Sequence, residues 1–381
     1  MLHKKTNIFV EKLEHSSWIH KMEQALSKPI EKFGVQPIYD VLRETLQGDT
    51  PIGKETLDAI SLLLASHLSK ISQEPSISYY YLGYACQALG AFVENGANAD
   101  ALADYFAPLI TALIPQIFNT RESFYDQLKT KLPEQEKEEI KQRLERDING
   151  SLKPLELATA AILSRSPKAR MIIRQDENFL ATCSLLRWEY PFLYKVTHIL
   201  DYEEIIILEV YGKWGLRGRI SGISGNYQLL SLLSHYVGQW EKEIHPMLPQ
   251  EWIDCYLGVG AIDRAGIMEF NWQPRLWTAL CDQETFYIEP EHHILGGGSP
   301  ADIMPCPAID GKRVILWTPP DEDLAIHVGR DFEGLSASFN IVEILSLETV
   351  EKYREQIIHI SDDQRQKALQ LHEVATNQSL F

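Results

Sequence analysis

The sequence has few cysteines for its length, and they form no recognisable pattern. Cys86, Cys183, Cys255, Cys281 and Cys306 are odd in number and widely spaced, and no CxxC pair is present. A cysteine-based zinc site and a disulfide framework are therefore both disfavoured. The spacing indicates a reducing compartment, and we expect neither a metal nor a cofactor.

Long apolar runs are also lacking. The first twelve residues contain no apolar stretch of signal-peptide length. The longest apolar runs, such as Ala59–Ala65 and Ile205–Leu208, are far too short to span a membrane. We expect a cytoplasmic protein that does not enter a membrane.

Positive charge is scarce. The 381 residues include 36 Lys and Arg against 53 Asp and Glu, which gives a net charge of −17. The field of such a chain repels polyanions, so nucleic acid and anionic membrane surfaces are disfavoured as partners. The length suggests two or three domains, and 45% hydrophobic residues suffice for a sizeable core.

The N-terminal part has helical periodicity. Apolar residues recur three and four positions apart, with proline and glycine between the segments. We expect helices over Ser16–Phe33, from Pro37, and over Lys54–Ile71, Ser76–Glu94 and Ala99–Phe118. Pro29 interrupts or kinks the first helix, while Pro108 and Pro115 bend or break the last. Short turns and the absence of a fixed period predict an irregular antiparallel helical array.

A highly charged segment, 129–149, follows this array. Ile140, Leu144 and Ile148 give it one thin apolar stripe, which is typical of an exposed surface helix more than of a specific partner helix. We expect Asn149-Gly150 to end it and two further helices over Pro154–Leu163 and Pro167–Leu186. The predicted division is a helical domain over 1–150, a helical connector over 151–190 and a mixed domain over 191–381.

Beyond residue 190 the pattern changes to short β-branched runs. We expect a hairpin of Tyr202–Val210 and Gly215–Ile223, and helices over Asn226–Trp240 and Leu347–Val374. Asp310-Gly311 predicts a tight turn before a strand. The strand candidates after the hairpin are Gly266–Leu280, Thr285–Ile288, Lys312–Thr318 and Ser338–Ser346. The irregular order favours an α+β fold with a mixed α/β C-terminal domain and a mainly antiparallel sheet.

No motif names a reaction, but Tyr287–Pro307 is the densest cluster of glycine, proline and titratable groups. His292, His293 and Asp302 are weak candidates for a catalytic acid–base pair. Gly297, Gly298 and Ser299 could wrap an anion with backbone N–H groups, although the P-loop lysine and spacing are missing. The alternative is an ordered loop in which glycines supply positive φ angles.

The second candidate is the glycine-rich segment Gly212–Asn226, which carries three cations. Arg217 and Arg219 should share one face of a strand, and with Lys213 they could bind a phosphate or carboxylate. The segment does not match the dinucleotide fingerprint, and Ser224 does not lie in a GxSxG elbow. The alternative is a twisted hairpin with exposed basic residues.

Three pieces of the C-terminal part resemble a set of uncharacterised bacterial proteins. The pieces begin at Arg217 in RGRISGISGNYQLLSLL, at Gly297 in GGSPADIMP and at Asp310 in DGKRVIL. The resemblance covers roughly residues 200–345, and Met304–Pro307 is an insertion relative to the shared pattern. It implies that both candidate segments belong to one domain, and it carries no catalytic residue across.

Two hypotheses follow. The first is a non-enzymatic interaction protein of a bacterial system, an adaptor, immunity or accessory protein that docks a protein partner. The chain has eight tryptophans, and any that lie at the surface would fit such a face. The second is an enzyme or small-anion binder that combines the loop 296–302 with Arg217 and Arg219. The absence of a catalytic motif and the helical half favour the first.

Overall fold

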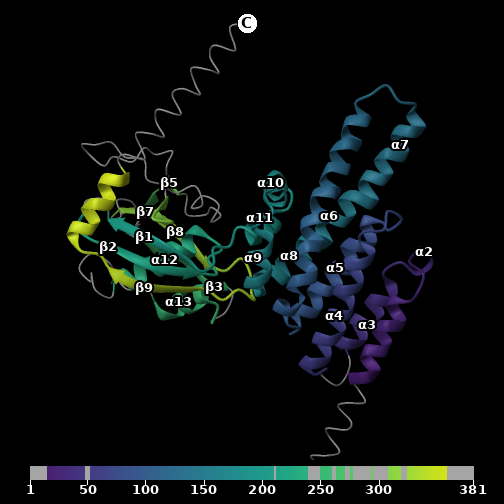
Figure 1. The fold of residues 1–381 in the computed structure, drawn as a ribbon, viewed down its shortest axis with the longest axis horizontal. Helices are drawn as coiled ribbons and strands as arrows, with labels where there is room; N and C mark the ends of the chain where they lie inside the picture. Colours follow the sequence, from purple (N-terminus) through teal and green to yellow (C-terminus); the bar gives the residue numbers. More distant parts are fainter. Residues whose placement is uncertain are drawn as a thin grey trace, which may run out of the picture. The chain divides into compact units, whose positions relative to one another are not determined.

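The computed structural model describes residues 15–47, 52–209, 212–238, 249–259, 263–270, 275–277, 293–294, 308–318 and 324–357. It divides into two compact units, Met1–Thr197 and His198–Phe381 (Figure 1). The first is a helical array and the second is built around a mixed sheet, so the predicted α+β class is confirmed.

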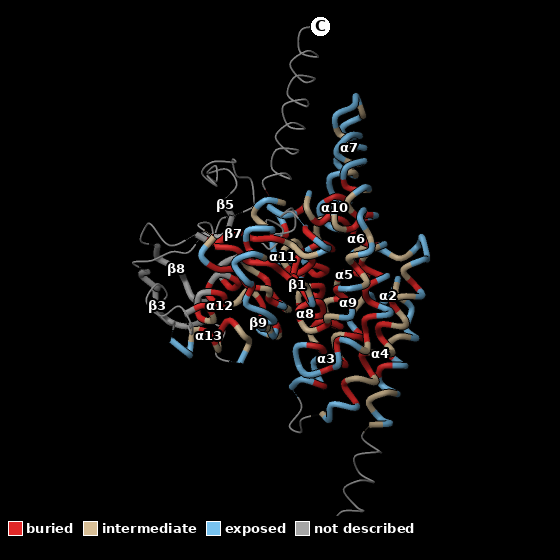
Figure 2. Tube along the Cα trace, turned by 60° about the vertical axis from the view of Figure 1, so that its left-hand side comes forward, coloured by how far each residue is buried: buried red, intermediate tan, exposed pale blue. Residues whose placement is uncertain are grey.

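The helical unit begins with a helix over 15–26, which ends before Pro29 as expected. The helices that follow are α2 (Ile30–Phe33), α3 (Gln36–Gln47), α4 (Lys54–Ile71), α5 (Tyr79–Glu94), α6 (Ala99–Leu128), α7 (Glu134–Arg143), α8 (Gly150–Arg165), α9 (Pro167–Ile173), α10 (Glu177–Leu185) and α11 (Pro191–Thr197). Helix α5 packs against α4 and α8, and α6 packs against α4, α9 and α10. Figure 2 shows the buried faces meeting along these contacts.

The helix predicted over Ala99–Phe118 extends ten residues farther, to Leu128, and neither Pro108 nor Pro115 breaks it. The helix runs through both prolines and has 30 residues. Each proline removes one backbone hydrogen bond, which costs roughly 3 kcal/mol in a helix interior. The burial of a whole apolar face, including Ile110, Ile114 and Ile117, outweighs that cost.

Helix α6 is also long and apolar enough to cross a membrane, by length and composition alone. No other helix in the described residues meets that test. More than half of its most apolar window, 56%, is buried inside the protein, so the contacts with α4, α9 and α10 account for its apolar face.

The expected stop at Asn149-Gly150 is wrong as well. A π-helical segment, η1 (Leu144–Asn149), joins α7 to α8 without a break. Leu144 and Ile148 are buried, so the apolar stripe anchors this segment in the core. Helix α7 itself buries no residue and, beside the end of α6, extends beyond the other helices (Figures 1 and 2).

The boundary between the two units lies between Thr197 and His198, seven residues after the predicted start of the mixed domain at residue 191. Segment 151–190, expected to be a connector, forms part of the helical core because α8 packs against α5. The expected helix over Pro167–Leu186 is two helices, α9 and α10, separated by a turn that ends at Asp176. Helix α11 was not expected.

The second unit contains β1 (Glu203–Glu209), β2 (Gly215–Ser221), α12 (Asn226–Gly238), α13 (Gln250–Leu257), β3 (Asp263–Phe270), β4 (Arg275–Trp277), β5 (His293–Ile294), β6 (Ala308–Ile309), β7 (Lys312–Thr318), β8 (Leu324–Gly329) and β9 (Ser338–Ile344). The main sheet has the order β5-β4-β7-β1-β2-β9, β6 pairs with β7, and β3 pairs with β8 separately. Within the described strands only the β1–β7 pair is parallel, which matches the predicted mainly antiparallel sheet.

Helices α12 and α13 cover one face of this sheet, over Ile205, Ile207 and Trp317. Leu345, Val350 and Ile357 cover part of the other face, over Ile206 and Leu316. Val350 and Ile357 belong to a helix described over 347–357. The β1–β2 hairpin and the turn at Asp310-Gly311, where both residues have positive φ, are as expected. The expected strand Thr285–Ile288 lies outside the described residues.

Candidate functional site

The first predicted site lies almost entirely outside the described residues. His292, Asp302, Gly297, Gly298 and Ser299 lie outside the described residues. For His293 only the backbone is described, in β5. No group of three or more potential metal ligands occurs among the residues that the structure describes.

The predicted cationic site is described, and it is already occupied by carboxylates. Arg217 donates to Glu204 at 3.2 Å and to Glu343 at 3.0 Å, and Arg219 donates to Glu204 at 2.7 Å. The two arginines lie on one strand face, because both reach the same carboxylate. We call these four side chains the ladder. With two positive and two negative charges, the ladder carries no net charge.

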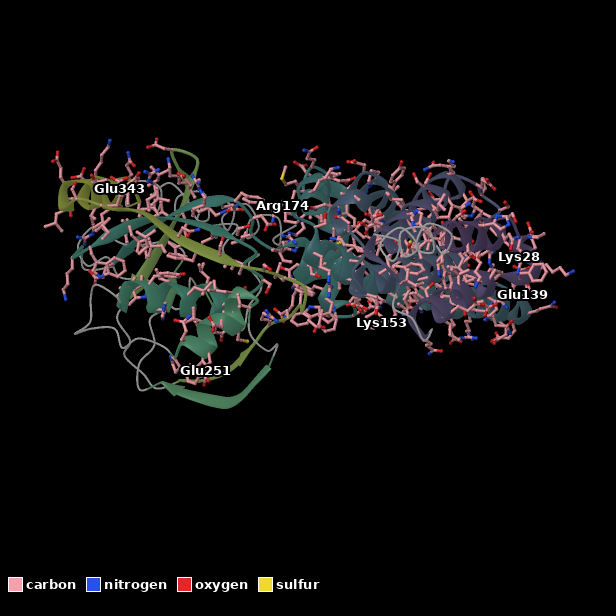
Figure 3. All side chains as sticks on the ribbon, turned by 90° about the horizontal axis from the view of Figure 1, so that it is seen from below. Lys28, Glu139, Lys153, Arg174, Glu251 and Glu343 are labelled. Atoms are coloured by element: carbon pink, nitrogen blue, oxygen red, sulfur yellow. The ribbon has the colours of Figure 1, made fainter. Side chains whose placement is uncertain are left out.

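A β-bulge makes the ladder possible. Arg217 lies opposite Glu343 on β9, but Gly218 lies opposite Ile341, so Val342 is an extra residue. Phe339 and Ile341 face the core under α12. Strict alternation would direct Glu343 to that same face, and the extra residue turns it to the face of Arg217. Glu343 is labelled on β9 in Figure 3.

The ladder shifts the pKa values of its members. Hydrogen bonds from Arg219 and Arg217 lower the pKa of the Glu204 carboxyl, against its partial desolvation. The hydrogen bond to Glu343 raises the pKa of the Arg217 guanidinium. An incoming phosphate or carboxylate would have to displace Glu204 or Glu343, so the geometry favours a structural role for the two arginines.

Lys213 is not part of this ladder. It lies in the turn after β1, at the opposite end of β2 from Arg219. Its backbone N–H donates to the carboxylate of Glu209 at 3.0 Å. The three cations are therefore not a single cluster.

The ladder leads to a pH prediction for Glu204→Gln. The folded-state pKa of Glu204 lies below its ordinary value of 4.5, so its contribution to stability is present above that value. The contribution is lost as the pH falls through the lowered pKa. The wild-type midpoint of thermal unfolding should exceed that of Glu204→Gln at pH 6 to 8, and the difference should shrink below about pH 4. A difference that is the same at every pH would contradict the ladder.

The helical unit offers a surface that the sequence analysis did not locate. Trp188 is 85% exposed and Leu185 is 66% exposed, and Phe192 is exposed as well. Leu185 is the last residue of α10, Trp188 lies in the turn that follows, and Phe192 lies in the first turn of α11, so the three are close together in sequence around this turn. We call them the Trp188 patch.

Two open hollows lie near the patch, along one face of α6. The first, of about 530 Å³, is lined by Pro108, Thr111, Ile172, Gln175, Asp176 and Glu177. The second, of about 540 Å³, is lined by Ala112, Pro115, Gln116, Asn119, Thr120, Ser123 and Asn178. Their α6 residues follow one another along the helix, and Glu177 and Asn178 are neighbours in sequence, so the two hollows adjoin. We call the two hollows together the α6–α10 groove.

An ion pair connects the groove to the patch. The buried guanidinium of Arg121 donates to Glu189 at 2.9 Å, which fastens the turn carrying Trp188 to α6. The charged residues on both sides of Trp188, Arg187 and Glu189, are a sequence signal for an exposed turn. The helix predicted over Pro167–Leu186 ends just before these residues, so the sequence pattern assigned them to no element.

No family model matches this chain, and no curated protein or solved structure matches it. The resemblance of residues 200–345 to uncharacterised bacterial proteins therefore stays a prediction.

Proposed function

We propose that this chain is a non-enzymatic interaction protein of a bacterial system, which docks a protein partner in the cytoplasm through the Trp188 patch. The main support is the exposure of Trp188, since an indole in water loses the free energy that its burial would provide. Tryptophan is also the residue type most enriched among the side chains that dominate binding energy.

The helical unit suits such a role. Its helices pack side by side around a core that includes Phe92, Phe106 and Phe179, so the patch stands on a rigid support. Cys86, Cys183 and Cys255 are buried and form no disulfide, which agrees with a reducing compartment. Desolvation raises the pKa of Cys86 to about 12, so this thiol is no nucleophile at neutral pH.

The small-anion alternative has less support. Its cationic half, Arg217 and Arg219, is neutralised by Glu204 and Glu343. Surface ion pairs of this kind are individually weak, yet a competing anion must replace charge-assisted hydrogen bonds that already exist.

A pull-down from the native host with the full chain and with Trp188→Ala tests the proposal. At least one host protein should be recovered reproducibly with the wild type. Removal of a central aromatic anchor should weaken binding by about thirtyfold, equivalent to about 2 kcal/mol. The affinity of that protein for both forms is then measured by calorimetry.

Phe33→Ala is the matched control, because Phe33 is also an exposed aromatic side chain but belongs to α2. It should bind the partner as the wild type does. Recovery of no reproducible partner, or equal binding by Trp188→Ala, would contradict the proposed function.

A further inference from the structure

The α6–α10 groove is long enough to hold an extended peptide. From Pro108 to Ser123 it follows fifteen helical steps, which correspond to about 22 Å along the axis of α6. At about 3.3 Å per residue, a strand-like segment of about seven residues would fill it. Both hollows are open to solvent, so a chain could enter them from outside the protein.

The walls carry unused hydrogen-bonding groups. Four amide side chains line the groove: Gln116, Asn119, Gln175 and Asn178. Within the part of the chain that the structure describes, the only hydrogen bonds recorded for these residues use their backbone. Each amide offers both a donor and an acceptor, which is the pair that the N–H and C=O groups of an extended backbone require.

The two ends of the groove differ in charge and polarity. Asp176 and Glu177 line one end, and no ion pair involves either of them in the described residues. One oxygen of Asp176 caps α10 by accepting from the N–H of Phe179 at 2.9 Å. The other end is close to Arg121, which holds the turn of the Trp188 patch.

We propose that the α6–α10 groove binds an extended peptide segment of the partner, with a lysine or arginine side chain of that segment against Asp176 and Glu177. The inference rests on the proposed function and names the form in which the partner is recognised. The four amides bind the peptide backbone, and an apolar side chain farther along the segment contacts the Trp188 patch.

A library of capped linear nonapeptides, presented to the full-length chain, tests the inference. Selected peptides should contain a lysine or arginine at one position and an apolar residue several positions away. The affinity of a selected peptide, measured by fluorescence anisotropy, should fall about tenfold or more in Asp176→Asn with Glu177→Gln. Asparagine caps helices as well as aspartate does, so this variant keeps α10 intact.

A second variant, Asn119→Ala with Asn178→Ala, should weaken every selected peptide by a similar factor, whatever its side chains. The control is Glu136→Gln with Glu138→Gln on α7, which removes two exposed charges away from the groove and should leave binding unchanged. Selection of peptides without a cationic residue, or binding that no groove variant weakens, overturns the inference.

The two proposals fail in different ways. If no linear peptide is selected but a host protein still binds in a manner that depends on Trp188, the groove inference is wrong and the proposed function stands. If neither the library nor the host extract yields a ligand, both are wrong.

Discussion

Replacement of Gly83 by valine is expected to destabilise the helical unit by about 3 kcal/mol or more. Gly83 lies on the face of α5 that packs against α8, where a Cβ atom would lie 2.7 Å from the carbonyl oxygen of Ser151. Because the obstacle is backbone, the two helices would have to separate along their contact. Gly90, two turns later, meets the Cα of Ala158 at 2.9 Å in the same way.

The midpoint of urea unfolding, followed by circular dichroism at 222 nm, measures this effect. Gln142→Val on α7 is the control, because it adds the same β-branched residue to an exposed helical position. That control should cost less than about 1 kcal/mol, which is the range of helix propensity. Equal midpoints for the two variants would show that α5 and α8 do not approach as closely as described.

The periodicity of the sequence predicted most elements because burial determines them. The helix over Lys54–Ile71 and the strands around Ile205 and Val314 each bury one regular face or a whole apolar run, so local pattern and tertiary structure agree. The wrong predictions lie where local signals and packing compete. Proline and Asn-Gly are strong local signals for a break, yet α6 and the segment from α7 to α8 continue through them.

The candidate sites were harder to predict, for a related reason. The face shared by Arg217 and Arg219 follows from strand geometry and was predicted correctly. Their carboxylate partners were not predicted. Glu343 reaches that face only because of the bulge at Val342, and the two-residue periodicity of a strand does not predict where a bulge occurs. The α6–α10 groove is lined by helices more than fifty residues apart in sequence, so no local sequence pattern predicts it.

Substitution of Glu156 by alanine is expected to cost about 2 to 4 kcal/mol. Glu156 belongs to α8 and is completely buried, and its carboxylate accepts from the backbone N–H groups of Phe192 and Leu193 at 2.9 and 3.4 Å. These are N–H groups of the first turn of α11, which have no partner within their own helix. Lys153 donates to the second carboxylate oxygen. Alanine would remove the acceptor of one buried and one part-buried N–H group, and also the ion-pair partner of the half-exposed Lys153.

Glu156→Gln separates the hydrogen bonds from the charge. Glutamine keeps a side-chain oxygen for the N–H groups of α11 but removes the ion pair with Lys153, whose ammonium is largely in water. Its cost should therefore be smaller, about 1 kcal/mol. Amide hydrogen exchange supplies the local readout: Phe192 and Leu193 should lose protection in Glu156→Ala and retain most of it in Glu156→Gln. Unchanged protection in the alanine variant would mean that α11 is held by its apolar contacts alone.

Because Phe192 is also part of the Trp188 patch, loosening α11 should weaken partner binding in Glu156→Ala but hardly in Glu156→Gln.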